Sequence, residues 1–478
     1  MDRPTPFRKS LLLGQRNTVP LMTLRPHQNL LLLLATTVAF TGVAVAQERT
    51  ESVVHPPVRY LEGNEGIGGF SDGNAIRLRT QTQRGINAGD FLIWPALKLE
   101  GRYDSNIFQS SDEETPQAVP MLRIMPGIAL TNPASSKLAF SLGAEADVRV
   151  YLSENEALQA LTNAGVKGDL RVDILPTGPV TVSIFDVFRR TLNARRNDTS
   201  QTYNLNQNMA ALRVNIHPGA GALDIALGYA FNVSLYDDFE QANSMSHDML
   251  FRTTWRFYPK TLALLEARGN FRDWETDSQY EGLYVDNKSF RVFAGLSGYI
   301  TRWLGTLLKV GYGNSFHDAG SSYESVVGQA ELQFRINPSI LIAAGYSRDF
   351  QNSFYANFFT ENKGYLRSQM RFGGRVGLDL TAGYHLIDFS EFDPAALDPT
   401  VTVFVSHKER RDQHISGHAK VDVDITRWIG MTVGYEVRAV FSNFRIENSE
   451  FIDSELVKHI DYGGYVRHQV YGSINVRY

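Results

Sequence analysis

The chain is 478 residues long, and 43% of them are hydrophobic and 21% charged, a composition that suits a folded protein rather than a disordered tail. The sequence has no cysteine, which excludes a disulfide framework, a cysteine-ligated zinc site and a thiol nucleophile. The formal net charge of −4 gives no support for nucleic-acid binding, and none is expected.

The first 46 residues predict a secretory signal peptide. Residues 1–28 contain five basic residues and one acid, and residues 30–45 form an apolar run that ends in the tripeptide Ala44-Val45-Ala46. A transmembrane anchor is the alternative, but the run of 16 residues is short for a span of about 20. Cleavage after Ala46 removes five of the 47 basic and one of the 51 acidic residues, which changes the net charge from −4 to −8.

Residues 47–88 predict a flexible periplasmic extension, because they are rich in Gly, Pro, Gln and Arg and show weak periodicity. Gly63, Gly66, Gly68 and Gly69 cluster in this segment. A phosphate-binding loop needs a strand before such glycines and a helix after them, and the pattern predicts neither.

From about residue 91 the pattern becomes that of β-strands. In one segment, apolar residues occupy every second position from Leu223 to Val233. A period of two gives each strand one apolar and one polar face. We count eighteen segments of this kind, and sixteen strands are also compatible with the pattern. The segments are centred near residues 98, 126, 145, 169, 185, 211, 229, 252, 267, 293, 310, 331, 344, 367, 381, 419, 434 and 472.

The connections between these segments alternate in length. Every second connection is a short turn with Pro or Gly, as at residues 176–179 and 337–339, or one of two near copies at residues 300–305 and 425–430. The intervening connections are longer and polar: residues 105–118, 153–162, 192–203, 237–246, 275–286, 390–411 and 441–465. This alternation is typical of a bacterial outer-membrane barrel with short periplasmic turns and longer extracellular loops.

The sequence therefore predicts an all-β fold over residues 89–478, a transmembrane antiparallel β-barrel in the bacterial outer membrane. Its last strand, which ends in Tyr478, would pair with the first strand and leave no unpaired edge in lipid. Trp255, Trp303 and Trp428 lie beside short turns, where an interfacial aromatic belt is expected. A soluble barrel is the alternative, but the predicted inward face is polar and offers no filling for a soluble core.

Strand parity assigns the polar face to the lumen, and this face carries more bases than acids. Arg252 and Arg256 lie on one predicted strand, Arg268 and Arg272 lie on the next, and Glu266 is predicted to face Arg252. Guanidinium groups in this arrangement could bind anionic sugars or carboxylates. The alternative is that these bases pair with acids of the wall and only keep the lumen hydrated. The predicted pore-lining residues are Arg252, Arg256, Glu266, Arg268, Arg272, Arg291, Arg367 and Arg371.

Motifs for catalysis or cofactor binding are not found in the sequence. It contains no H-E-x-x-H, no P-loop and no G-x-S-x-G. His414 and His418 share a strand face, but four strand positions separate them by ~13 Å, too far for one metal ion. Asp422 and Asp424 lie among inward bases and suit a solvated wall better than a glycosidase pair. We therefore expect no enzyme activity, no metal and no cofactor.

One motif points to a family. The first strand ends in Tyr103-Asp104-Ser105-Asn106-Ile107-Phe108, which has the form Y-D-S-N-[IV]-F, and residues 125–130 are similar to a "PGL-x-L" second strand. These segments resemble the β-barrel porins encoded in bacterial exopolysaccharide and capsule loci. The motif residues carried over are Tyr103, Asp104, Ser105, Asn106 and Phe108.

The resemblance implies an outer-membrane conduit for a secreted polysaccharide, surrounded by outer-membrane lipid and lipopolysaccharide. It also implies a periplasmic polysaccharide-export protein and an inner-membrane polymerase or co-polymerase as partners. A related class of polysaccharide porins carries an N-terminal tetratricopeptide domain, and this sequence shows no such repeats.

Three functions follow from these observations. An export conduit predicts a wide lumen. A general or anion-selective diffusion porin predicts an inward-folded constriction loop with acids facing the arginine ladder. If the protein is a structural or adhesive barrel, we expect a plugged lumen and loops that carry the function. The long loops at residues 390–411 and 441–465 are the segments expected to narrow the lumen, if any does.

Overall fold

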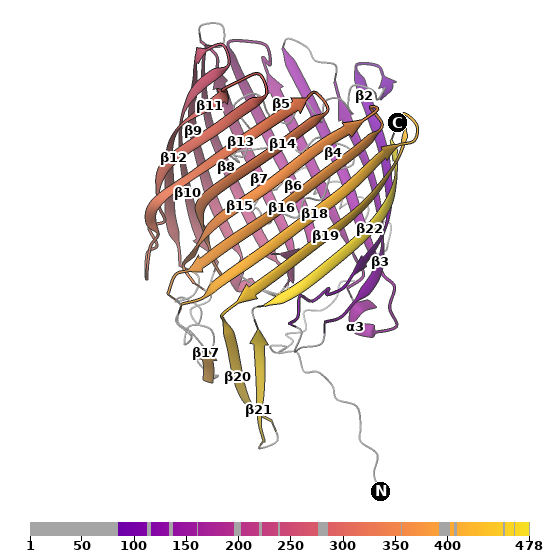
Figure 1. Cartoon of the computed structure of the whole chain (residues 1–478), viewed down its shortest axis with the longest axis vertical. Coiled ribbons are helices and arrows are strands. Elements are labelled where there is room, and N and C mark those ends of the chain that lie inside the picture. The colour runs from indigo at the N-terminus through magenta and orange to yellow at the C-terminus, as the bar shows by residue number, and fades with distance from the viewer. Residues whose placement is uncertain are drawn as a thin grey trace, which may run out of the picture. The chain divides into compact units, whose positions relative to one another are not determined.

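The computed structural model describes residues 85–477, apart from residues 112–115, 133–136, 160, 196–201, 219–221, 238–239, 276–284, 355, 392–401, 406–408, 453–454 and 463. The predicted signal peptide and nearly all of the predicted extension therefore lie outside the described residues. Within the described part, eighteen antiparallel strands form one closed barrel, which confirms the predicted fold class (Figure 1).

Each of the eighteen predicted strand centres falls inside one of the eighteen barrel strands. The barrel strands are β2 (Phe91–Asp104), β3 (Val119–Thr131), β4 (Leu138–Tyr151), β5 (Asn163–Ile174), β6 (Val180–Arg195), β7 (Thr202–Ile216), β8 (Leu223–Tyr236), β9 (Ser244–Tyr258), β10 (Thr261–Trp274), β11 (Asn287–Tyr299), β12 (Leu304–Asn314), β13 (Glu324–Asn337), β14 (Ile340–Asn352), β15 (Phe358–Phe372), β16 (Val376–Phe389), β18 (Arg411–Asp424), β19 (Ile429–Ser442) and β22 (Tyr465–Arg477).

Pairing of the first and last barrel strands closes the sheet. β2 pairs with β22 from Ala96 opposite Arg477 to Asp104 opposite Gln469, and the other barrel strands pair in chain order. Closure matters in lipid, where each unsatisfied backbone group costs several kcal/mol. A further short strand, β1 (Ile86–Ala88), forms a hairpin with the start of β2.

The strands are polar inside and apolar outside, the reverse of a soluble protein. On β2 the outward Leu97 and Leu99 are exposed, whereas the inward Glu100 is fully buried. Trp255 and Trp428 are exposed on the outer surface beside short turns, as expected for the aromatic belt. Among the described residues, no helix is long and apolar enough to cross a membrane.

The two near-identical turns share one hydrogen-bonding pattern. Thr301 Oγ1 accepts hydrogen bonds from the backbone N–H groups of Trp303 and Leu304, and Thr426 Oγ1 accepts them from Trp428 and Ile429. The threonine hydroxyl thus holds the tight turn that precedes each following strand.

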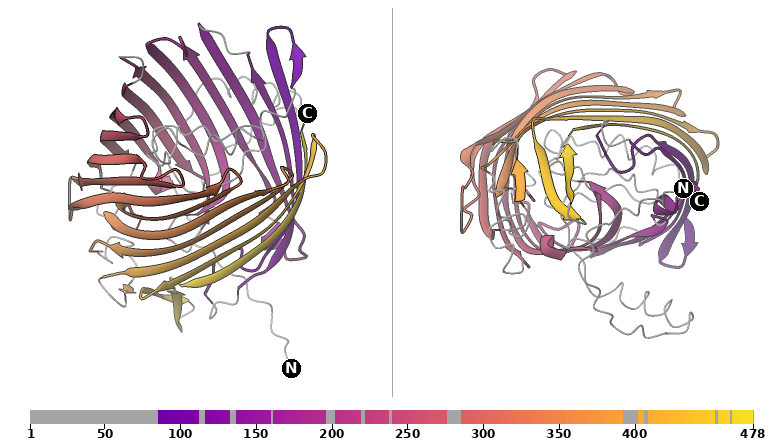
Figure 2. Two further views of the ribbon diagram at one scale, coloured as in Figure 1. Left: turned by 45° about the horizontal axis from the view of Figure 1, so that its top comes forward. Right: turned by 90° about the horizontal axis from the view of Figure 1, so that it is seen from below.

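The long connections lie at the opposite end of the barrel from the end of β22, and several of them are structured. They hold α3 (Glu156–Gln159), the 3-10 helix η3 (Glu240–Ala242) and a three-stranded sheet of β17 (Thr402–Val405), β20 (Arg445–Ile452) and β21 (Glu455–Tyr462). This sheet extends beyond the rim in Figure 1 and crosses the outline of the mouth in the right view of Figure 2. The sequence pattern predicts only loops at these positions.

Candidate pore wall and constriction

Three bases converge on one buried carboxylate on the inner face of β9–β12. Arg252 lies opposite Glu266 in the strand register, and its Nη2 is 2.8 Å from Glu266 Oε2. Arg268 Nη2 is 2.8 Å from Oε1 of the same residue, and Lys309 Nζ is 3.9 Å from it. The Glu266 side chain is only 1% exposed. One negative charge is thus surrounded by three positive charges, and the cluster keeps a net positive charge.

The other bases of the predicted ladder lie near this cluster but do not join it. Arg291 lies opposite Arg268 in the register, yet its Nε donates to Asp349 of β14 over 2.7 Å. Arg272 donates to Ser244 Oγ over 3.2 Å. Over the fully described strands β9–β12, the inner face carries six bases, Arg252, Arg256, Arg268, Arg272, Arg291 and Lys309, and two acids, Asp248 and Glu266.

The remaining predicted residues belong to another part of the wall. Arg367 Nη2 of β15 is 3.9 Å from Glu331 Oε1, and Glu331 also accepts a hydrogen bond from the Tyr365 hydroxyl. Arg371 lies four positions further along β15, and its guanidinium rests on Gly377 of β16. The eight predicted residues therefore divide between two sectors of the barrel.

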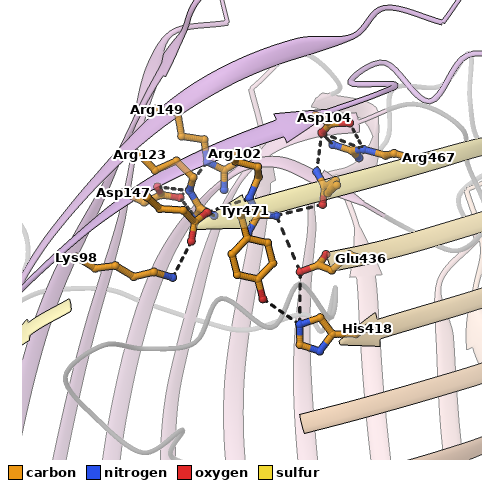
Figure 3. A network of polar contacts seen from close by, with 12 residues as sticks. Lys98, Arg102, Asp104, Arg123, Asp147, Arg149, His418, Glu436, Arg467 and Tyr471 are labelled. Carbon is orange, nitrogen blue, oxygen red and sulfur yellow. Dashed lines mark hydrogen bonds and ion pairs between the residues drawn. The ribbon is translucent and has the colours of Figure 1, made fainter. Parts of the chain in front are cut away.

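A second basic cluster lies where the barrel closes (Figure 3). Glu100 is fully buried, and Lys98, Arg102 and Arg123 approach its carboxylate to 2.7, 2.9 and 3.0 Å. Arg123 also donates two hydrogen bonds to Asp147, over 3.0 and 2.7 Å. Sequence parity placed these residues inward but did not single them out, because their grouping depends on the register between β2, β3 and β4.

The family motif at the end of β2 ties the closing strands together. The Asp104 carboxylate accepts a bidentate ion pair from Arg467 of β22. Ser105 donates its N–H to the carbonyl of His468 over 2.9 Å, and its Oγ accepts the N–H of His468 over 2.8 Å. Both residues therefore act on the seam between β2 and β22.

The rest of the motif orders the loop that follows. The Asn106 side chain donates to the carbonyls of Ser110 and Val466 over 2.7 and 3.1 Å and accepts the N–H of Ser110 over 2.9 Å. Ile107 is buried in a cluster with Val119, Met121, Tyr151 and Leu158. Tyr103 and Phe108 are exposed. The motif is thus a structural device for closing the barrel, rather than a lining of the pore.

The hairpin formed by β14 and β15 separates from β13 near its tip, while β15 stays paired with β16 as far as Phe359. β14 pairs with β13 only as far as Arg348, but it pairs with β15 as far as Asn352. Residues 349–354 and 356–361 therefore belong to a hairpin without a neighbour on the β13 side. We call this segment the inner hairpin.

Contacts with β11 hold the base of the inner hairpin. The guanidinium of Arg291 donates to Asp349 and also to the carbonyl of Phe350 over 2.6 Å, and it lies 3.8 Å from the centre of the Phe350 ring. The side chains of Asn287 and Asn352 exchange two hydrogen bonds of 2.9 and 3.1 Å. Phe350 is buried in a cluster with Phe293, Tyr323 and Val327.

The tip of the inner hairpin reaches strands on a distant part of the wall. Phe354 is almost fully buried, and its ring meets Tyr236 at the end of β8 and Trp274 at the end of β10 edge-on, with centroids 5.4 and 6.4 Å away. The hairpin thus spans from β14 to β8 near the loop-side mouth. The sequence analysis expected any narrowing to come from residues 390–411 and 441–465, and it missed this short connection.

Residues 81–314 match the family described as "Putative beta-barrel porin 2". The match is just under half of the sequence, and it covers the motif at Tyr103–Phe108, the Glu266 cluster and the strands as far as β12. The inner hairpin lies beyond it. Together with the closed barrel, this match places the protein in the bacterial outer membrane as a β-barrel porin.

The fold is also similar to solved outer-membrane structures. These include a BenF-like porin from Pseudomonas fluorescens Pf-5 (9% identity, 81% of this chain and 99% of that chain, TM-score 0.46). They also include OpdK from Pseudomonas aeruginosa with vanillate (11% identity, 81% and 99%, TM-score 0.43) and the siderophore receptor PirA from Pseudomonas aeruginosa (9% identity, 83% and 81%, TM-score 0.44). No curated protein sequence matches the chain.

The described residues offer no group of His, Asp or Glu side chains able to hold a metal ion.

Proposed function

We propose that this porin is a conduit for the export of a secreted, acidic polysaccharide across the outer membrane. The observation that carries the proposal is the basic inner wall, where two buried carboxylates, Glu100 and Glu266, are each surrounded by three bases. Guanidinium groups bind carboxylates bidentately, so such a wall favours acidic sugars. The polymer class rests on the resemblance of the Tyr103–Phe108 motif to porins of polysaccharide loci.

The size of the barrel is compatible with this cargo. Eighteen strands about 4.8 Å apart and tilted by about 40° give a backbone diameter of roughly 35 Å. Side chains and the inner hairpin occupy part of this width, and a single extended glycan chain needs only a fraction of it. The function in this proposal is transport rather than catalysis, with a periplasmic polysaccharide-export protein delivering the polymer.

An in-frame deletion of the gene tests the proposal. Polysaccharide outside the cell and polymer retained in the periplasm are both quantified, and uptake of small solutes is measured in the same strain. Loss of surface glycan with periplasmic accumulation and normal solute uptake is the expected result. Normal surface glycan would overturn the export proposal.

An anion-selective diffusion porin is the second candidate, and the inner hairpin favours it. An inward-folded segment whose acid faces an arginine is the arrangement that the sequence analysis expects of such a porin, and Asp349 faces Arg291 in this way. Single-channel recordings separate the candidates. A diffusion porin would show steady anion-selective conductance and a growth defect on small anionic nutrients when deleted.

A further inference from the structure

Arg291 is the inner-wall base that links the barrel to the inner hairpin. Its Nε donates to Asp349, its Nη2 donates to the carbonyl of Phe350, and its guanidinium stacks on the Phe350 ring. Arg268, directly opposite on β10, carries the same charge but binds Glu266 within the wall. Arg291 is thus the charged attachment of the hairpin to β11, beside the hydrogen bonds between Asn287 and Asn352 and the packing of Phe350 on Phe293.

The acid that binds Arg291 is open to water. The side chain of Asp349 is 46% exposed and that of Arg291 is 17% exposed. Glu266, in contrast, is 1% exposed and is held by three bases. An exposed ion pair is weakened by solvent and by competing ions, whereas a buried one does not exchange its partner readily. Of Asp349 and Glu266, Asp349 is therefore the carboxylate that a dissolved anion can displace from its base.

The surrounding charge draws such an anion to this place. The inner face of β9–β12 carries six bases against two acids, and Asp349 neutralises only one further charge. A positively charged surface inside a low-dielectric wall raises the local concentration of anions. A carboxylate fits the planar guanidinium with two parallel hydrogen bonds, which a neutral sugar cannot form.

We propose that Arg291 is the anion-binding site that controls the inner hairpin. A carboxylate of the transported solute displaces Asp349 from the guanidinium, and the hairpin then separates from β11 and widens the pore. The ligand class is the carboxylated saccharide, such as a uronic acid. This inference rests on the proposed function only in taking the transported solute to be acidic.

Recordings of the full-length, purified porin in planar lipid bilayers test this proposal, with glucuronate as the probe and glucose as the neutral control. Glucuronate is expected to raise the conductance of the native channel in a saturable way, and glucose is expected to have no such effect. Arg291→Ala should show the high conductance without glucuronate and no further response. Lys288→Ala removes an exposed base of the same strand that pairs with Asp318, and it should keep the glucuronate response.

A second variant makes the test independent of the folding of Arg291→Ala. Asp349→Asn breaks the same ion pair but keeps the guanidinium, so this channel should also show the high conductance without glucuronate. An unchanged glucuronate response in Asp349→Asn, or a native channel that glucuronate does not affect, would overturn the inference.

The two proposals fail separately. A channel that responds to glucuronate in a strain whose surface glycan survives deletion would contradict polysaccharide export alone. A channel without the response in a strain that loses its glycan would contradict the role of Arg291 alone.

Discussion

Asp104 at the end of β2 and Arg467 of β22 form a buried ion pair across the seam that closes the barrel. The Nε of Arg467 lies 2.8 and 3.0 Å from the two carboxylate oxygens of Asp104, and the two side chains are 0% and 3% exposed. These residues are 363 positions apart in the sequence. The pair therefore forms only when the last strand has found the first.

Asp104→Ala should destabilise the barrel by about 3–5 kcal/mol, because it leaves the buried guanidinium of Arg467 without its carboxylate. The free energy of unfolding can be measured by urea titration in lipid vesicles with tryptophan fluorescence. Asp237→Ala is the matched control, because the pair of Asp237 with Arg190 is 28% and 26% exposed and should contribute about 1 kcal/mol or less. Equal losses in the two variants would contradict a special role for the seam pair.

The strands could be predicted from the sequence because two solvents act on one wall. Side chains that face lipid must be apolar, and those that face the lumen are polar. Apolar residues therefore recur at every second position of each strand, as from Leu223 to Val233. The same reasoning assigned Arg252 and Glu266 to facing positions, and they pair in the sheet, although a bulge between Thr261 and Ala263 shifts the register that the turn at Pro259 and Lys260 begins.

The grouping of side chains from distant strands could not be predicted in this way. The inner hairpin depends on contacts such as Arg291 with Asp349, 58 positions apart, which no local pattern encodes. A signal was present in the aromatic residues Phe350, Phe354 and Phe358, since a hydrated loop has no need of three phenylalanines four residues apart. The motif that contains Asp104 could be recognised from the sequence by its resemblance to a family. Its role in closing the barrel could not be predicted, because that role depends on the register between β2 and β22.

Gly434→Ala should destabilise the barrel by about 1–3 kcal/mol, because the ring of Tyr471 covers this glycine and an added Cβ would collide with it. The displaced ring would also lose its stacking with Arg102, whose guanidinium lies 4.5 Å from the ring centre. Gly101→Ala is the control, since nothing lies within 4 Å of a Cβ at that outward position. The urea titration described for Asp104 applies, and a neutral Gly434→Ala would contradict the close packing.

Glu266→Gln should increase the anion preference of the channel by about a factor of two, because one charge is removed within a Debye length of about 8 Å of the permeating ions. Joint neutralisation of Arg252, Arg256, Arg268 and Arg272 should abolish that preference. The reversal potential in a KCl gradient measures both effects. Glu324→Gln is the control, because Glu324 bonds the exposed Tyr312 hydroxyl on the outer surface. Unchanged selectivity in the fourfold variant would remove these residues from the function.

Acid should loosen the inner hairpin through His317, in the loop between β12 and β13. Burial lowers the pKa of His317 from 6.5 to about 4, against the opposing influence of a backbone hydrogen bond at Asn357 and the charge of Asp318. Its ring stacks on Phe358 of the hairpin at 6.1 Å, and Ser315 Oγ lies 3.0 Å from its Nδ1.

The direction of the effect follows from the lowered pKa. The folded loop favours the neutral imidazole, so its stabilisation is complete above pH 6.5 and is lost as the pH falls from 6.5 towards 4. We expect conductance to rise between pH 6.5 and 4 in the native channel, as the ring becomes charged and leaves Phe358. His317→Phe keeps a stacking ring without a titrating group, and its conductance should change less over this range. Identical pH profiles for the two proteins would contradict the role of His317.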